Sequence, residues 1–453
     1  MKEKLRKRRR NDLTQGKEWK VILQFAIPLL IGNLLQQTYT ITDSIIVGQF
    51  LGKEALAAIS ASFFIYYFII SLVIGIGSGT SVVVSQYFGA HEYDKVQGAF
   101  SSFFLFMLVT GIILSIGGII FAESVFRLTN TPEEVIPQAV SYFKIYIGGT
   151  FLFVTFNSII SILRGIGESL KPMMFIFITT VINILLDLVF ILGLKWGIEG
   201  AARATVIAQG IGMCIALIYV NNTHPLLSIK KKDLLFNKKL FVEGLKIGLP
   251  TSVQQCAIAL GLIALLSIVN SFGTDTLTAY GAGGKIDTII TQAILTLSGA
   301  LAAFAGQNIG AGKFDRVRRG LRFSLYVNAM FSILMFVVIW LWGDQIMMAF
   351  TNDTQVIAIG HEFLLISAGF LIFHGALNIF NGALRGAGDT MFTMVTSLVS
   401  LWLIRIPLAS FLGNKLGREG IWWAIGLSIV IAFVITYIYY KTGHWKKRSV
   451  VKH

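Results

Sequence analysis

Four polar residues within otherwise apolar segments have side chains that can bind a small cation. Asp43 lies in the first apolar segment, Asn183 and Asp187 lie one helical turn apart in the fifth, and Thr205 lies in the sixth. A charged side chain at the centre of a membrane helix costs about 2.5 to 3.5 kcal/mol, so each carboxyl group there needs a partner, a proton or a function. Two carboxylates, an amide oxygen and a hydroxyl are the oxygen ligands that a hard cation prefers. We therefore predict that Asp43, Asn183, Asp187 and Thr205 bind a small cation, Na⁺ or H⁺. The alternative is that Asp43 and Asp187 are neutral acids held by interhelical hydrogen bonds, or that one of them lies in an external vestibule.

The composition of the chain indicates that lipid is its solvent. Of the 453 residues, 55% are hydrophobic and 13% are charged, whereas about a quarter are charged in soluble proteins. Apolar runs of about 20 to 30 residues without strict alternation predict spanning helices and not a membrane barrel. We expect an all-α membrane protein with twelve transmembrane helices, near residues 21–49, 54–80, 95–121, 135–163, 171–194, 198–220, 240–271, 276–307, 316–342, 356–384, 390–413 and 420–440.

The net charge of +15 reports topology and not a nucleic-acid partner. Of the 38 Lys and Arg residues, 29 lie in the two termini and in the connections after even-numbered segments. Six lie on the opposite side, and three, Arg203, Lys285 and Arg405, lie within segments. The excess of basic residues on cytoplasmic loops predicts that both termini are cytoplasmic.

The second half of the chain repeats the first. Pro28 has its counterpart in Pro250, and the loop QYFGAHEYDKVQG at Gln86 has its counterpart in QNIGAGKFDRVRRG at Gln307, at almost the same offset. LRGIGES recurs as LRGAGDT at the same offset as the two loops. Each half holds six spans, so the two lobes should be parallel and pseudo-symmetric, an architecture that fits a transporter. The predicted domains are a basic cytoplasmic segment 1–20, an N-terminal lobe 21–227, a cytoplasmic linker 228–239, a C-terminal lobe 240–441 and a cytoplasmic tail 442–453.

The two lobes differ in chemistry. At the matching positions of the second lobe, Leu265 replaces Asp43 and Leu408 replaces Asp187, so we expect ion coupling in the first lobe. The second lobe has its own ionisable residues within spans, which are Lys285, Asp287, His374 and Arg405. His374 could relay protons or pack as a hydrogen-bonded residue, and Arg405 could be structural.

Further polar residues are candidates for lining a substrate cavity, although such residues also join helices by hydrogen bonds. The candidates are Asn33, Gln36, Tyr39, Asn157, Gln255, Lys285, His374 and Asn378. Pro28 and Pro250 each free a backbone carbonyl one turn earlier and permit bending, so both are candidate hinges.

Motifs of catalysis are missing from the sequence. It contains no GxxxxGK[ST] phosphate loop, no HExxH helix and no GxSxG elbow. We therefore expect no enzymatic activity, no ATP hydrolysis by this chain and no cofactor apart from the coupling ion.

The repeat, the paired prolines, the two loops and the segment INILLDLVFIL resemble the multidrug and toxic compound extrusion (MATE) transporters, and most of all the DinF-like branch. The resemblance implies a two-lobed antiporter of the bacterial plasma membrane, whose N-lobe acidic site falls here on Asp43, Asn183, Asp187 and Thr205. Where the NorM-like branch has C-lobe carboxylates, this sequence has Gln255 and His374, so a second cation site there is in doubt. Leu188 replaces the usual proline after the acidic residue.

The predicted function is secondary active export of amphipathic or cationic organic compounds in exchange for Na⁺ or H⁺, by alternating access. The alternative is a flippase for a lipid-linked precursor, which would require a wide cationic cavity. The expected partners are small molecules and the lipid bilayer, without nucleic acid, and the protein is expected to be a monomer.

Overall fold

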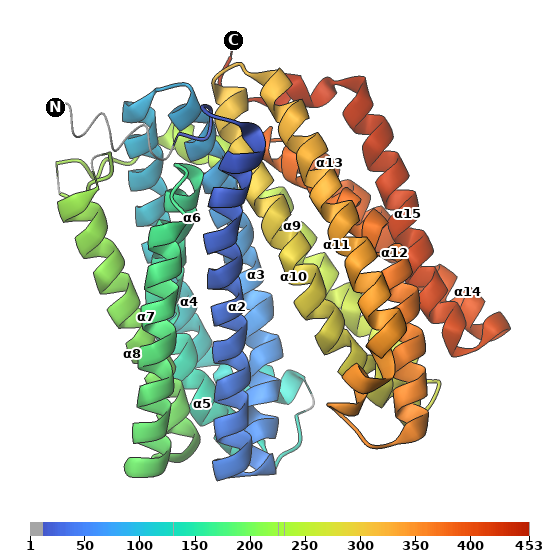
Figure 1. Cartoon of the computed structure of the whole chain (residues 1–453). Coiled ribbons are helices and arrows are strands. Elements are labelled where there is room, and N and C mark those ends of the chain that lie inside the picture. The colour runs from blue at the N-terminus through green and yellow to red at the C-terminus, as the bar shows by residue number, and fades with distance from the viewer. Residues whose placement is uncertain (1–11, 130, 225, 231, 453) are drawn as a thin grey trace. The chain divides into compact units, whose positions relative to one another are not determined.

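The computed structural model describes residues 12–129, 131–224, 226–230 and 232–452, apart from the side chains of Lys53, Leu56 and Phe64. Residues 1–11 of the predicted basic segment, residue 231 of the predicted linker and residue 453 of the predicted tail lie outside the described residues. All regular structure in the described ranges is helical (Figure 1). Among the described residues, eleven helices are long and apolar enough to cross a membrane, and a bent pair of helices, counted as one span, makes a twelfth. The predicted all-α fold with twelve spans is thus confirmed.

The chain forms two compact units, and two of its helices each begin in one unit and end in the other. Helix α2 (Glu18–Leu51) packs with unit 2 up to Ala26 and with unit 1 from Ile27 onward. Helix α9 (Lys238–Asn270) packs with unit 1 up to Gly248 and with unit 2 from Leu249 onward. Pro28 and Pro250 lie directly beside these two boundaries, as residues inside the helices.

Unit 1 is made from the first half of the chain. After α2 it contains α3 (Lys53–Gly89), α4 (Tyr93–Leu128), α5 (Ile136–Gly148), α6 (Thr150–Gly165), α7 (Leu170–Asp187), the π-helical segment η1 (Leu188–Gly193), α8 (Gly197–Ile218) and the π-helical segment η2 (Tyr219–Thr223). Helices α7 and α8 lie side by side, as Figure 1 shows in green.

The fourth predicted span, 135–163, is bent. Helices α5 and α6 meet at an angle of 45° around Gly149. A Cβ atom at Gly149 would lie only 2.5 Å from a methyl carbon of Val206 on α8. The glycine therefore allows α8 to approach the backbone at the bend, and glycines are a frequent cause of helix kinks.

Helix α7 changes geometry directly after Asp187. The chain continues as the π-helical segment η1, beginning at Leu188. Such wide turns are rare and occur often at functional sites. The π-helical geometry after Asp187 therefore forms with Leu188, and not a proline, at the next position.

Unit 2 is made from the second half of the chain. After α9 it contains α10 (Thr274–Gly310), α11 (Phe314–Met348), α12 (Thr354–Gly386), α13 (Thr390–Leu398), the π-helical segment η3 (Val399–Arg405), α14 (Ile406–Leu416), α15 (Arg418–Thr442) and the short 3₁₀ helix η4 (His444–Arg448). Helix α12 runs unbroken through the region that corresponds to the α5–α6 bend.

Hydrogen bonds and ion pairs attach the start of α2 to unit 2. The Leu13 backbone N–H donates to Gln307 Oε1 at 2.9 Å. Glu18 in the first turn of α2 accepts from Arg319 Nε at 2.8 Å and lies 3.4 Å from an Arg316 nitrogen. These contacts hold residues 13–26 against the connection between α10 and α11.

A similar set of contacts attaches the start of α9 to unit 1. Tyr87 donates its hydroxyl hydrogen to Glu243 Oε2 at 2.7 Å. The Asn237 backbone N–H, directly before α9, donates to Ser102 Oγ at 2.8 Å. The predicted linker therefore docks on α4 at its end.

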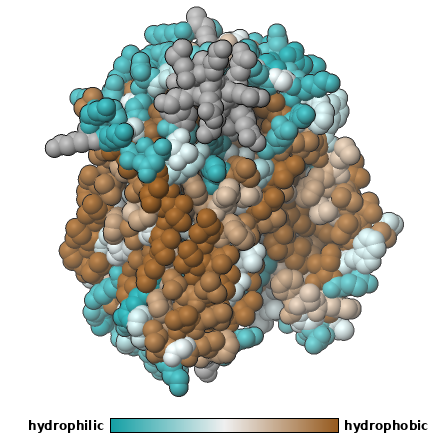
Figure 2. All heavy atoms as spheres, turned by 60° about the vertical axis from the view of Figure 1, so that its left-hand side comes forward, coloured by the Kyte–Doolittle hydropathy of each residue, from teal (hydrophilic) through white to brown (hydrophobic). Residues whose placement is uncertain are grey.

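The outer surface of unit 1 is apolar over the length of its helices. Ile113, Ile120 and Phe121 on α4 are 63%, 67% and 60% exposed. Figure 2 shows apolar side chains over the middle of the visible face and hydrophilic side chains gathered toward its two ends. Exposed apolar surface of this kind marks contact with lipid.

Candidate functional site

The predicted coupling residues lie together in unit 1, on three helices. Tyr39 and Asp43 share one face of α2, and Asn183 and Asp187 share one face of α7, each pair four residues apart. Since four residues rise about 6 Å along a helix, the two helices present two polar layers. Asp43 and Asp187 form one layer, with their carboxyl groups close enough to interact. Thr205 of α8 joins the other layer.

Helices α2 and α7 lie close together near Gly32. A Cβ atom at Gly32 would lie 3.6 Å from the Met173 backbone and 3.6 Å from the Ile176 side chain. The two helices are therefore in contact about two turns before the polar layers, and the same spacing along both helices brings Tyr39 beside Asn183.

The carboxyl pair has oxygens without hydrogen-bond donors. Asp43 Oδ1, both carboxyl oxygens of Asp187 and Asn183 Oδ1 are buried and have no hydrogen-bond partner among the described residues. Ionised carboxylates only accept hydrogen bonds, so the pair can bond to itself only when one group carries a proton. Buried polar atoms are rarely left unsatisfied. The cluster thus has the chemistry to take up a proton or a cation.

No larger metal-binding cluster accompanies the pair in the described ranges. Nowhere in them do three or more His, Cys, Asp or Glu side chains converge. The ligands that the site offers are two carboxyl groups and one amide oxygen, which are hard ligands suited to Na⁺.

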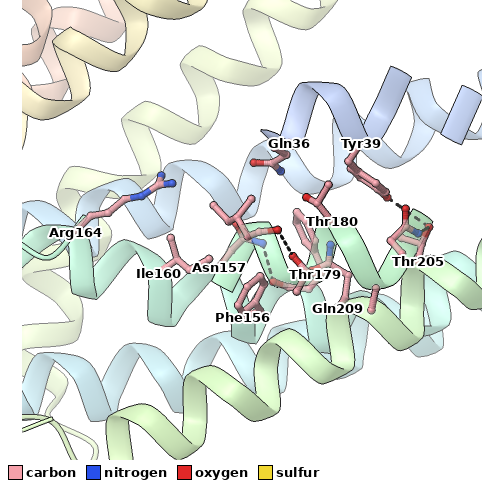
Figure 3. A pocket seen from close by; sticks show the side chains of 14 residues that line it. Gln36, Tyr39, Phe156, Asn157, Ile160, Arg164, Thr179, Thr180, Thr205 and Gln209 are labelled. Carbon is pink, nitrogen blue, oxygen red and sulfur yellow. Dashed lines mark hydrogen bonds between the residues drawn. The ribbon is translucent and has the colours of Figure 1, made fainter. Parts of the chain in front are cut away.

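Thr205 orients the amide of Asn183. Its Oγ1 accepts hydrogen bonds from Tyr39 Oη at 3.4 Å and from Asn183 Nδ2 at 3.3 Å. Figure 3 shows Tyr39 and Thr205 meeting at one end of a cavity. Because the Asn183 nitrogen is turned to Thr205, its oxygen stays available for another partner.

A cavity of about 60 Å³ extends from this layer. Gln36, Asn157, Thr180 and Gln209 lie along it, and Arg164 lies at the end away from Tyr39 and Thr205 (Figure 3). A cavity needs about 10 to 15 Å³ for each water molecule, so this one has room for about four to six. The cavity therefore has room for water or a small polar group beside Asn183.

Tyrosines near the carboxyl pair were missed from the sequence. Tyr142 and Tyr146 on α5 lie within electrostatic range of Asp43. Their rings stack at 5.6 Å, and the Tyr146 ring meets that of Tyr66 on α3 at 4.4 Å. Two tyrosines four residues apart in an apolar segment were the available signal, because this spacing places both hydroxyls on one helix face.

The structure distributes the predicted cavity residues between the units. Gln36, Tyr39 and Asn157 line the cavity of unit 1, and His374 lines a second cavity in unit 2. The remaining four line neither cavity: Asn33, Gln255 and Asn378 are partly buried, and Lys285 is exposed. A single substrate cavity that contains all eight stays a prediction, as do the hinges at Pro28 and Pro250.

Comparisons with known proteins agree with this architecture. The sequence model of the MatE family matches residues 28–189 and 250–411, one copy in each half. The probable multidrug resistance protein YpnP of Bacillus subtilis is 34% identical, with 96% of this chain and 97% of the relative covered. The probable multidrug resistance protein YoeA of the same organism is 31% identical, with 96% of each covered.

A solved structure of a MATE protein in a bent conformation has the same fold. Its TM-score is 0.91 at 22% identity, and the match covers 97% of this chain and 99% of that chain. Placement in the DinF-like branch stays a prediction. On the family match and the similarity along almost the whole sequence, this multi-span membrane protein belongs to the MatE family, the multidrug and toxic compound extrusion transporters.

Proposed function

We propose that the protein is a secondary active exporter that exchanges amphipathic, cationic organic compounds for Na⁺ or H⁺ across the bacterial plasma membrane. Its relatives carry the name of multidrug resistance proteins. The observation that carries the exchange is the cluster of buried oxygens on Asp43, Asn183 and Asp187 that lack donors. A site with this composition is stable only when a proton or a cation occupies it.

Occupancy of the pair provides the driving event of the proposed cycle. When the ion leaves, two like charges remain close together in surroundings of low polarity, which disfavours that arrangement. A change in the position of Asp43 along or around α2 relieves the repulsion. Because α2 begins in one unit and ends in the other, its movement couples the state of the carboxyl pair to alternating access, with Pro28 as the hinge.

The coupling ion is tested with purified protein in vesicles. A Na⁺ gradient and a pH gradient are imposed separately while the efflux of a fluorescent organic cation is followed. We expect one gradient, or each of them, to accelerate efflux. Efflux that is indifferent to both gradients would contradict antiport.

The role of the carboxyl pair is tested with Asp43→Asn and Asp187→Asn. Each substitution keeps the volume of the side chain and removes one ionisable group, so we expect gradient-driven efflux to fall by about tenfold or more. Asp275→Asn, at an exposed position in the first turn of α10, is the matched control and should keep full efflux. Unchanged efflux in both variants would refute the assignment of the site.

The flippase alternative has less support. It requires a wide cationic cavity, whereas the cavity in unit 1 measures about 60 Å³ and has a single cationic side chain, Arg164, at its end. Asp43 and Asp187, one helical turn from this cavity, supply the negative charge that export of organic cations requires, although neither of them lines the cavity.

A further inference from the structure

Unit 2 contains a second cavity, which the proposed exchange does not use. Its volume is about 150 Å³, and its polar lining consists of Tyr280, Asp287, Ser367, His374 and Arg405. These residues come from three separate parts of the chain, on α10, α12 and the end of η3. Leu262, which also lines the cavity, is 48% exposed and lies at its rim.

Asp287 and Arg405 face this cavity without binding each other. Asp287 Oδ1 accepts a hydrogen bond from Ser367 Oγ at 2.7 Å. Arg405 Nε donates to Ser428 Oγ at 2.9 Å, and Ser428 is fully buried. Within the described part of the chain neither charged group makes another side-chain hydrogen bond, and no ion pair joins them. The second carboxyl oxygen and the outer guanidinium nitrogens therefore remain available for a ligand.

Two opposite charges held apart in one cavity define the charges of an occupant. A buried charge is stable only when it is paired and hydrogen-bonded. Asp287 and Arg405 interact electrostatically with each other and with His374, which lines the same cavity, but no direct contact joins the two charged groups. An ammonium group on Asp287 and a carboxylate on Arg405 would give each of them a direct partner. One small molecule that carries both charges would satisfy both side chains at once.

The remaining walls of the cavity are aromatic and aliphatic. Trp422 stacks on Tyr280 with ring centroids 5.5 Å apart, and it meets Phe363 at 4.9 Å. An engineered apolar cavity of about 150 Å³ in another protein binds benzene. The space between the charges therefore has the size and the surface for one aromatic ring.

We propose that this cavity binds a small zwitterionic aromatic molecule, with its ammonium group on Asp287, its carboxylate on Arg405 and its ring against Phe363 and Trp422. The site lies inside unit 2 and needs neither the carboxyl pair of unit 1 nor an ion gradient. It is therefore independent of the proposed exchange.

Calorimetric titration of the full chain in lipid nanodiscs tests the proposal with four probes of one ring size. The zwitterion 4-(aminomethyl)benzoate is compared with benzylamine, benzoate and benzyl alcohol. We expect the zwitterion to bind about tenfold more tightly than either singly charged probe, because each charged group adds its own hydrogen bonds. Equal affinity for all four probes, or no heat with any of them, as in a cavity that holds only water, would overturn the proposal.

Variants assign the two ends of the ligand. In Asp287→Asn the zwitterion should bind about as weakly as benzoate, and in Arg405→Gln about as weakly as benzylamine. Lys415→Gln removes an exposed charge in the last turn of α14 and should leave all affinities unchanged. Asp187→Asn should also retain zwitterion binding, which separates this site from that of unit 1. Tight zwitterion binding that survives both Asp287→Asn and Arg405→Gln would place the ligand elsewhere, and the four probes on the unaltered protein decide the question if a variant does not fold.

Discussion

Units 1 and 2 repeat one helical frame but place different chemistry at equivalent positions. Tyr66 and Tyr146 of unit 1 correspond to Asp287 and Ser367 of unit 2, at the same offset that relates the two repeated loops. In unit 1 the two tyrosine rings meet at 4.4 Å, and in unit 2 the serine hydroxyl donates to the carboxylate at 2.7 Å. The same contact between two helices therefore packs rings in one unit and holds a charge in the other.

Conversely, unit 2 has apolar residues where unit 1 has its carboxyl pair. Leu265 and Leu408 occupy the positions equivalent to Asp43 and Asp187 and contribute to the hydrophobic core of unit 2. The polar clusters described above thus occupy different positions in the two units, with α2, α7 and α8 contributing in unit 1 and α10, α12 and η3 in unit 2. In both units a charged residue adjoins a π-helical segment: Asp187 directly precedes η1, and Arg405 ends η3.

The packing of large against small residues is reversed as well. In unit 1, Val206 packs on Gly149, where the helix is bent. In unit 2, the Phe370 ring packs on Gly426, where the equivalent helix is continuous. In the repeat, Phe370 takes the place of Gly149 and Gly426 takes the place of Val206. In unit 1 the glycine therefore lies in the bent helix. In unit 2 it lies in the facing helix, and Phe370 packs on it and lines a cavity.

The largest effect is expected from placing the valine of unit 1 in unit 2. A Cβ at Gly426 would lie 2.0 Å from the Phe370 ring, so Gly426→Val should lower the free energy of unfolding by about 3 kcal/mol through overpacking. Thermal unfolding in detergent measures the loss. The double variant Phe370→Gly with Gly426→Val should recover part of it, because it recreates the pair of unit 1. Strictly additive losses would show that the two residues do not depend on each other.

A smaller loss is expected from the polar pair of unit 2. Ser367→Ala removes the hydroxyl that donates to Asp287, and losing a hydrogen bond to a charged group should cost about 2 kcal/mol of unfolding free energy. The exposed Ser271→Ala is the control, since its hydroxyl donates to the Ile268 carbonyl in the last turn of α9. If both substitutions have equal effects, the pair contributes no more than an exposed serine.

In unit 1 the comparable substitution should act on transport. Thr205→Val removes the acceptor of Tyr39 and Asn183 and frees the Asn183 amide to rotate. Because both bonds are long, at 3.4 and 3.3 Å, we expect gradient-driven efflux to fall by about fivefold, equivalent to about 1 kcal/mol. Thr205→Ser keeps the acceptor and should retain most of the efflux. A serine variant as impaired as the valine variant would point to packing and not to the hydrogen bonds.

The smallest effect is expected where the two long helices begin. Glu18→Gln weakens a partly exposed ion pair with Arg319 and should cost about 0.5 kcal/mol, and less at high salt. Glu243→Gln keeps an acceptor for the Tyr87 hydroxyl and should be insensitive to salt. Chemical unfolding at low and high ionic strength measures the loss in each variant. If the two losses depend equally on salt, the starts of α2 and α9 are not held by different kinds of contact.

The spans of unit 1 and the convergence of its polar residues could be predicted because their signals are local. Asp43 and Asp187 are charges within apolar runs, and Asn183 lies one turn from Asp187 on the same helix face. The repeat then showed that unit 2 has leucines at the equivalent positions and so lacks this pair of carboxyl groups. Such arguments need only periodicity and the cost of charge in lipid.

The cavity of unit 2 and the bend in unit 1 depend on packing that the sequence does not display. Asp287, His374 and Arg405 are far apart along the chain and lie on three different helical segments, so only the fold brings them to one cavity. Taken singly, His374 and Arg405 were indistinguishable from packing residues. The bend at Gly149 depends on Val206 of another helix, which no local pattern reveals.

Helices α2 and α9 have a consequence for any attempt to cut the chain. If the chain is cut between the halves, near residue 228, the first fragment keeps residues 13–26, which pack with unit 2. The second fragment keeps residues 238–248, which pack with unit 1. Neither fragment would be a self-sufficient folding unit. Two co-expressed fragments should assemble only by trading these helix ends, so functional complementation would require both pieces in the same membrane.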